Sequence, residues 1–249
     1  MSHHYLDESI TADDWAVGTV TLRGAEARHA ATVGRVRVGE SLSVGDGRGT
    51  VGTGRVVSSA SDAVVIAIEQ HQQVPAPAPE FWLVQALAKG DRDELAVQTV
   101  TELGATGVLP WQAERSVVQW RSEKAVRGVE RWRTIVREAS KQAMRAWVPT
   151  VASLAVGTKV AVAPEVQDAL VLVLEPTAET ALTDIPAADL QAATRIVLVV
   201  GPEGGISPSE LTALSTAGAR QVRLGTEVLR TSTAGPAAIA ALQVLLGRW

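Results

Sequence analysis

The residues best placed to do chemistry form a glycine-rich turn, Gly201-Pro-Glu-Gly-Gly205, directly after the apolar run Val197–Val200. Ser207, Pro208 and Glu210 then have the order of an N-cap, a first helical position and the acid of a capping box. A strand, a glycine turn and a helix N-terminus together are typical of a ligand site at the carboxyl edge of an α/β sheet. A tight structural turn is the alternative that this segment alone leaves open.

A second loop, Val222–Ala234, also follows a strand-like segment and leads into an apolar helix. It turns at Gly225, and Arg230 lies between an apolar pair and a cluster of hydroxyl residues. A third strand end is Leu174-Glu175-Pro176. Three strand-end loops that meet at one crevice predict a pocket. No G-x-G-x-x-G with a following acid and no G-x-x-x-x-G-K-[ST] occurs, which disfavours dinucleotides and nucleoside triphosphates.

Two patterns of secondary structure position these loops. Short Val-rich strands are predicted at 15–22, 41–44, 50–57 and 63–69, a spacing typical of a small barrel. After the proline-rich Val74–Pro79, strands at 81–86, 107–111, 169–174, 196–200 and 221–224 alternate with helices at 91–103, 123–146, 209–217 and 233–246. This alternation predicts an open parallel α/β sheet. We therefore expect domains at 1–73 and 81–249, joined by a linker at 74–80.

Composition limits the class of protein. The 249 residues include no cysteine, and the four histidines are too scattered to predict a metal site. No apolar run is long enough for a membrane span and no signal peptide is evident, so we expect a soluble, cytoplasmic protein. The net charge is −4, yet residues 112–145 carry nine Lys and Arg against four acids. Such a basic block favours a nucleic-acid partner, with a solvated helix face as the alternative.

An ordered set of motifs resembles the bacterial 16S ribosomal RNA uridine-N3 methyltransferases, a family of the trefoil-knotted SPOUT superfamily that uses S-adenosylmethionine. In the first half the matching segments are His29–Arg35, Gly39-Glu40, Gly45–Gly47, Lys89, Glu102–Gly104, Pro110 and Glu114–Ser116. In the second half they are Trp132–Ile135, Glu138-Ala139, Gln142, Arg145, Pro149, Gly201–Gly205, Leu224-Gly225, Leu229-Arg230, Thr233 and Ala234. The matches cover nearly the whole chain.

Three positions depart from the family pattern. Ser232 stands where the family usually has a glutamate, Gly34 replaces a leucine and Ala143 replaces a serine. A carboxylate role at position 232 cannot be carried over to this chain.

The resemblance implies a knotted parallel sheet preceded by a PUA-like β-barrel, a homodimer, and a 16S RNA or small-subunit substrate. No metal and no membrane are implied. It also implies that S-adenosylmethionine is held by the three loops. The expected cofactor-binding residues are Leu174, Glu175, Gly201, Glu203, Gly204, Gly205, Leu224, Gly225, Val228, Leu229, Arg230, Thr233 and Ala234.

The implied reaction places a methyl group on N3 of a uridine. We expect Arg230 to stabilise charge that develops on the uracil, and Glu203 to act as the base or to orient the cofactor. The expected RNA-binding residues are His29, Arg35, Arg37, Lys89, Arg115, Arg137, Gln142 and Arg145. Trp111, Trp120, Trp132 and Trp147 are suited either to stacking on bases or to packing. A ribose 2′-oxygen methyltransferase and a noncatalytic RNA-binding or assembly factor are the alternatives.

Overall fold

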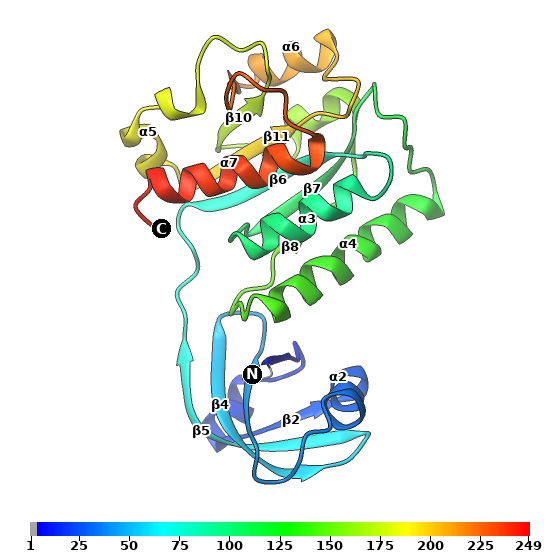
Figure 1. The fold of residues 1–249 in the computed structure, drawn as a ribbon, viewed down its shortest axis with the longest axis vertical. Coiled ribbons are helices and arrows are strands. Elements are labelled where there is room, and N and C mark those ends of the chain that lie inside the picture. Colours follow the sequence, from blue (N-terminus) through cyan, green and yellow to red (C-terminus); the bar gives the residue numbers. More distant parts are fainter. Residues whose placement is uncertain (1–3) are drawn as a thin grey trace. The chain divides into compact units, whose positions relative to one another are not determined.

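A computed structural model describes residues 4–249, so residues 1–3 of the predicted first domain lie outside the described part (Figure 1). The chain divides into two compact units. Unit 1 comprises Met1–Ala76 and Ser140–Val148, and unit 2 comprises Pro77–Ala139 and Pro149–Trp249.

Unit 1 is built on a five-stranded sheet in the order β1-β3-β4-β5-β2. β1 runs parallel to β3, and the other pairs are antiparallel. The elements are β1 (His4–Leu6), α1 (Ala12–Val17), β2 (Thr19–Arg23), α2 (Gly24–Arg28), the π-helical turn η1 (His29–Val33), β3 (Ser41–Gly45), β4 (Thr50–Ser59) and β5 (Ala63–Gln73). A core that includes Tyr5, Leu22, Leu42 and Ile66 holds the sheet and helices together.

The predicted strand at 15–22 is wrong in its first half, because Trp15 lies in α1. The amide of Asp14 donates a hydrogen bond to the hydroxyl of Thr11, and the amide of Thr11 donates one to the Asp14 carboxylate. This capping box starts a helix, and Gly18 ends it at φ 74°. The departure from the family pattern at Gly34 also has a structural explanation. A Cβ at this position would lie 2.5 Å from the hydroxyl of Tyr5.

The segment Ser140–Val148 belongs to unit 1, whereas the sequence placed it in the second domain. Lys141 forms a buried ion pair with Glu26, at 3.1 Å between Nζ and Oε1. The helix that contains Lys141 ends at Gln142, four residues earlier than predicted, and Met144 then adopts φ 52°. Isolated burial of either charge would be costly, so the pair fixes this segment against α2.

Unit 2 contains a parallel sheet in the order β12-β10-β11-β6-β7-β8, with β9 paired to β7. Its strands are β6 (Glu80–Ala86), β7 (Gly107–Gln112), β8 (Thr150–Val151), β9 (Ala155–Val156), β10 (Leu170–Leu174), β11 (Arg195–Val200) and β12 (Arg220–Val222). Its helices and 3-10 turns are α3 (Arg92–Glu102), α4 (Glu123–Gln142, which continues into unit 1), η2 (Gly157–Val162), η3 (Leu182–Asp184), α5 (Ala187–Ala192), α6 (Pro208–Thr216) and α7 (Thr231–Leu245). The predicted parallel α/β sheet is confirmed.

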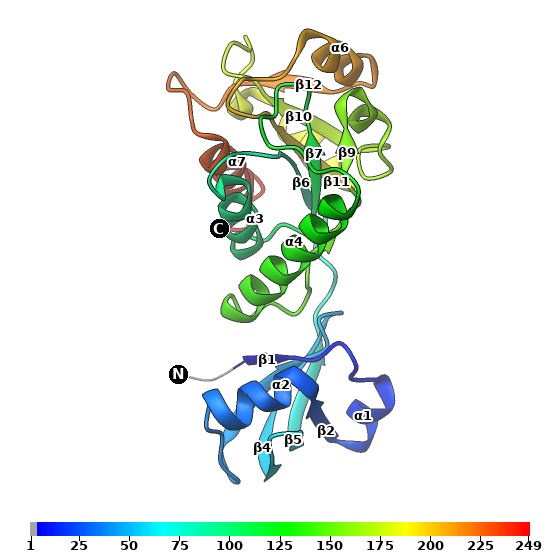
Figure 2. The same cartoon turned by 90° about the vertical axis from the view of Figure 1, so that its right-hand side faces the viewer.

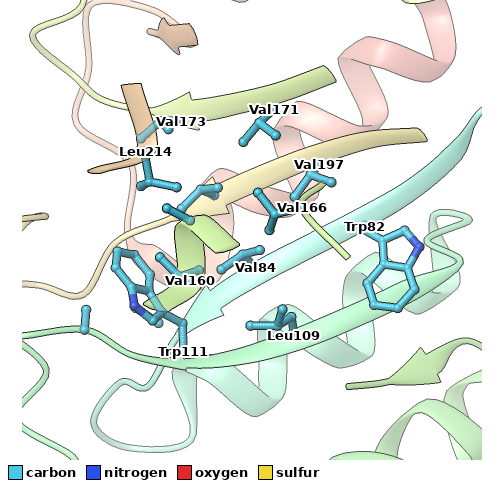
Figure 3. Close-up of a cluster of buried hydrophobic side chains, with 14 of the residues drawn as sticks. Trp82, Val84, Leu109, Trp111, Val160, Val166, Val171, Val173, Val197 and Leu214 are labelled. Atoms are coloured by element: carbon cyan, nitrogen blue, oxygen red, sulfur yellow. The ribbon is translucent and has the colours of Figure 1, made fainter. Parts of the chain in front are cut away.

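Both faces of this sheet are covered, which explains the near-continuous apolar character of its strands. On one face, Val84, Val171 and Val197 pack with Val160 of η2 and Leu214 of α6 (Figure 3). On the other face, α3 and α7 lie side by side (Figures 1 and 2). Gly235 lets α7 come close to the sheet, because a Cβ there would lie 2.8 Å from Cδ1 of Leu83.

Among the helices of residues 4–249, none has the length and apolar character needed to cross a membrane.

Candidate functional site

A cavity of about 330 Å³ lies at the carboxyl ends of β10, β11 and β12 in unit 2. These strands are parallel neighbours, so the loops after them emerge at the same edge of the sheet. A volume of this size is at the lower end of ordinary small-molecule sites. The three loops predicted to converge therefore do so.

Most of the predicted cofactor-binding residues line this cavity: Leu174, Glu175, Gly201, Glu203, Gly205, Leu224, Gly225, Val228, Leu229, Arg230 and Ala234. Gly204 and Thr233 are not part of its wall. Sequence reasoning missed other lining residues, namely Arg92, Pro176, Val200, Pro202, Ile206, Val222, Arg223, Glu227 and Thr231. Ser232, the departure from the family pattern, does not line the cavity.

The loop after β11 is fastened at its helix end by Ser207 and Glu210. The predicted capping box is confirmed. The amide of Glu210 donates a hydrogen bond to the hydroxyl of Ser207, and the amide of Ser207 donates one to Oε2 of Glu210. Glu210 is only 1% exposed, and its Oε1 accepts the amide of Glu114 at 2.7 Å. Ser209 donates to the Glu114 carboxylate, and hydrogen bonds from Ser207 and Ser209 lower the pKa of Glu114.

The same loop is held in its middle by Arg115, whose Nη1 donates to the carbonyl of Gly204 at 3.2 Å. A Cβ at position 204 would lie 3.2 Å from Cβ of Arg115, so the two segments are in close contact. Gly205 follows at φ 74°, a conformation that favours glycine. Arg115 thus holds the loop at Gly204, a residue that does not line the cavity.

Glu203 lies on the cavity wall, and its carboxylate is already engaged. Its Oε1 accepts the amide of Lys89 at 3.2 Å and Nη1 of Arg92 at 3.1 Å. Burial raises the pKa of Glu203, but hydrogen bonds from its own amide, from Lys89 and from Arg92 outweigh it and hold the pKa below its ordinary value of 4.5. A carboxylate that is tied to two donors and weakly basic is better suited to orienting the loop than to removing a proton.

The loop after β12 is held at its start by Arg223 and at its end by Thr231, whose hydroxyl donates to the carbonyl of Gly201. The amide of Arg223 donates to the carbonyl of Thr180, and its Nη1 donates to the carbonyl of Ala178 at 2.9 Å. Within residues 4–249, none of the backbone amides of 224–230 donates a recorded hydrogen bond. The side chain of Val228 is 77% exposed. This wall of the cavity is therefore open and weakly held.

Arg230 is the residue before α7, and its side chain is exposed at the cavity wall. The carbonyl of Arg230 accepts hydrogen bonds from the amides of Thr233 and Ala234, whereas its guanidinium has no hydrogen bond or ion pair with residues 4–249. The two other arginines of the wall are engaged, Arg92 with Glu203 and Arg223 with Ala178. Among the three arginines that line this cavity, Arg230 is therefore the one whose N–H donors all remain available to a ligand.

The residues predicted to bind RNA fall into two groups. His29, Arg35, Arg37, Gln142 and Arg145 belong to unit 1, and Lys89, Arg115 and Arg137 to unit 2. Lys89 and Arg115 both contact the Gly201–Gly205 loop, which places them beside the cavity. Arg137 pairs with Glu138 at 3.3 Å. Arg145 is half-buried, and burial lowers its pKa to about 10, so it is poorly placed for a solvent-exposed phosphate contact.

The tryptophans mostly pack. Trp111 and Trp132 are fully buried, which rules out stacking of either on an RNA base in this conformation. Trp120 lies edge-on to Trp132, with ring centroids 5.7 Å apart. In residues 4–249 no group of three or more His, Cys, Asp or Glu side chains is arranged to hold a metal ion.

The chemistry that this site can support follows from its wall. Apolar side chains and glycine main chain suit a flat ring, and the carboxylates of Glu175 and Glu227 suit hydroxyl groups or a cation. Arg230 adds a positive group with a fork of donors, which suits an oxygen that gains negative charge.

Family comparisons cover both units. The RNA methyltransferase domain family matches residues 75–243, and the RNA methyltransferase PUA domain family matches residues 22–69. Among curated proteins, ribosomal RNA small subunit methyltransferase E of Mycobacterium bovis is 43% identical over 95% of this chain and 90% of its own length. The protein of the same name from Bacillus subtilis is 29% identical over 90% of this chain and 89% of its own length.

Solved structures agree with this relationship. Ribosomal RNA small subunit methyltransferase E from Neisseria gonorrhoeae, bound to S-adenosylmethionine, superposes with a TM-score of 0.84 at 30% identity, and the match covers 98% of both chains. A methyltransferase from Legionella pneumophila with bound S-adenosylmethionine gives a TM-score of 0.84 at 27% identity, again over 98% of both chains. The chain therefore belongs to the family of ribosomal RNA small subunit methyltransferases E.

Proposed function

We propose that this protein transfers a methyl group from S-adenosylmethionine to N3 of a uridine in 16S ribosomal RNA. The observation that carries the proposal is the cavity at the carboxyl ends of β10, β11 and β12, with the guanidinium of Arg230 on its wall. Family membership supports the choice of cofactor and of an RNA substrate. The trefoil knot stays a prediction from the resemblance.

The residues of the cavity fit S-adenosylmethionine. Leu174, Val222 and Leu224 offer apolar surface for an adenine ring, and Gly201 and Gly225 expose main chain for its polar edge. Glu175 and Glu227 suit ribose hydroxyls or the cationic part of the molecule. When bound, S-adenosylmethionine supplies a methyl group made electrophilic by its sulfonium.

Arg230 supports the reaction electrostatically. Methyl transfer would break the N3–H bond of uracil, whose proton passes to solvent, and the S–CH3 bond of the sulfonium, which leaves as a neutral thioether, while the N3–CH3 bond forms. The negative charge left when the proton departs spreads onto the uracil oxygens. Arg230 donates to one of these oxygens and stabilises the charge where it develops. Glu203 holds the Gly201–Gly205 loop in place through Lys89 and Arg92, so we assign it to cofactor orientation.

RNA contacts extend over both units in this proposal. His29, Arg35, Arg37 and Gln142 would contact RNA from unit 1, and Lys89 and Arg115 from beside the cavity. Contacts between basic side chains and phosphates release counterions, so binding should weaken steeply with salt. Binding to small subunits that is independent of salt would contradict this assignment.

A homodimer and a cytoplasmic location belong to the same proposal. The C-terminal end of unit 2 exposes Val244 (60%) and Trp249 (62%), which offer apolar surface for a second copy. Light scattering should give twice the chain mass. A ribosomal substrate supports the proposed cytoplasmic location.

The experiment that tests the function is methylation of small subunits purified from a strain that lacks the gene. With the protein and S-adenosylmethionine, mass spectrometry of nucleosides should detect 3-methyluridine at one mapped position. A ribose-methylated nucleoside instead would support the 2′-oxygen alternative. If no methylated nucleoside forms and calorimetry detects no S-adenosylmethionine binding, a noncatalytic RNA-binding factor would be the better interpretation.

A further inference from the structure

Gln85 is a buried amide in β6, within the apolar segment Phe81–Ala86. Its side chain is 0% exposed. A buried amide costs free energy unless it is hydrogen-bonded, and a leucine of similar size would carry no such cost. The position therefore calls for an explanation other than packing.

The amide nitrogen of Gln85 joins a short chain of hydrogen bonds. Nε2 donates to Oγ1 of Thr231 at 2.7 Å and to the carbonyl of Ala86 at 3.1 Å. The Thr231 hydroxyl donates in turn to the carbonyl of Gly201 at 3.0 Å. A hydroxyl has one proton to donate and lone pairs to accept, so both bonds can exist at once. The chain links β6, the first residue of α7 and the first residue of the loop after β11.

Two of the three residues joined by these side-chain bonds lie at the cavity. Gly201 and Thr231 line it, while Gln85 does not. Thr231 is 8% exposed and directly follows Arg230, whose guanidinium is otherwise unfastened. A shift of Thr231 would move the Arg230 main chain, because the two residues share a peptide bond. The side chain of Gln85 thus reaches the cavity wall by a hydrogen bond to Thr231.

The carbonyl oxygen of the Gln85 side chain indicates that this arrangement serves function and not stability. Oε1 of Gln85 is buried and has no hydrogen-bond partner among residues 4–249. A buried acceptor without a partner reduces stability. Residues that break a local rule of this kind are expected at functional sites, where stability is given up for geometry.

We propose that Gln85 is a positioning residue for methyl transfer, which acts through Thr231 to set Arg230 and the Gly201 carbonyl relative to each other. This inference rests on the proposed function. A residue of this kind changes the rate and the cofactor affinity without touching substrate or cofactor, and its loss leaves the fold intact.

The test is a double-mutant cycle with Gln85→Leu and Thr231→Val. Turnover on small subunits and S-adenosylmethionine affinity by calorimetry are measured at a temperature at which every variant is folded. Each single change should lower kcat and weaken cofactor binding by about tenfold, and the double variant should be no worse than the poorer single one. Thr231→Ser, which keeps the hydroxyl, should recover most of the loss. Thr101→Val, which removes a buried hydroxyl from α3 away from the cavity, is the matched control and should behave like the wild type.

Several results would overturn the proposal. These are wild-type kcat and affinity in Gln85→Leu, losses that multiply in the double variant, or no recovery in Thr231→Ser. The proposed function fails separately, because in that case the wild-type protein itself would not methylate small subunits.

Discussion

The two loops that form opposite walls of the cavity differ in how they are held. The loop at 201–207 is anchored by Glu203 to Lys89 and Arg92, by Gly204 to Arg115 and by a capping box at Ser207. In the loop at 223–231, Leu224 is half-buried and residues 225–230 are exposed. The backbone amides of 224–230 donate no hydrogen bond to residues 4–249. Segments with few buried contacts open at low free energy. The wall formed by the loop at 201–207 is therefore ordered before a ligand binds. The loop at 223–231 keeps conformational freedom that it loses on binding.

Arg230→Ala should have the largest effect, because it removes the free cation of the open wall. A charge-assisted hydrogen bond is worth about 1.5–3 kcal/mol, so kcat should fall roughly ten- to hundredfold. Steady-state methylation of small subunits measures it. Arg220→Ala, which removes a surface arginine paired with Asp189 outside the cavity, is the matched control. Normal turnover in Arg230→Ala would remove this residue from the mechanism.

Glu203→Gln separates two roles on the fixed wall. If Glu203 fastens the loop, S-adenosylmethionine affinity should weaken by about tenfold while kcat at saturating cofactor is kept, because the ion pair with Arg92 is lost. Arg92→Ala should show the same pattern. A general base would behave in the opposite way, with a loss of kcat of about a hundredfold or more and little change in affinity. Calorimetry and turnover together decide between them.

A pair of glycine substitutions compares the backbones of the two walls. Gly205→Ala should lower the free energy of unfolding by about 1 kcal/mol, because an alanine is strained at φ 74°. Gly225→Ala should be neutral, since Gly225 is not left-handed and a Cβ there would meet only Oε2 of Glu227, at 3.8 Å. Urea denaturation measures both. Equal losses would contradict the difference between the walls.

The smallest effect concerns pH. The pKa of Glu203 lies below 4.5 in the folded protein, so its stabilising contribution is present above that pH and is lost as the pH falls through the folded value. The difference in Tm between the wild type and Glu203→Gln should thus be constant down to about pH 5 and shrink below it. The contribution of so exposed a pair is at most about 1 kcal/mol. A difference that grows on acidification would show that the contacts of Glu203 are not those of an ionised carboxylate.

Much of this arrangement could be predicted from the sequence, because local signals are strong where the site begins. The apolar run before Gly201 and the cap at Ser207 fixed the strand, the turn and the helix start. Arg92 and Gln85 could not be assigned, since their roles depend on β6 lying next to β11, and periodicity does not reveal which strands pair. The sequence predicts Thr233 and not Thr231 at the cavity, because the first residue of α7 is set by the contacts of the Thr231 hydroxyl.

Unit 1 was harder to predict for a related reason. The sequence around Trp15 is rich in residues that favour strands, but the capping box of Thr11 and Asp14 starts a helix there. Ser140–Val148 joins unit 1 through backbone hydrogen bonds to Gly47 and Gly49 and through the buried ion pair of Lys141 and Glu26. These residues are 115 positions apart, and no local pattern connects them.

Hydrogen exchange with and without S-adenosylmethionine compares both walls of the cavity in one experiment. We expect the amides of 224–230 to exchange fast in the free protein and to become protected when the cofactor binds, while those of Gly205 and Ser207, already hydrogen-bonded, change little. Protection of neither loop by saturating cofactor would contradict the assignment of this cavity. Equal protection of both loops in the free protein would contradict the difference between the two walls.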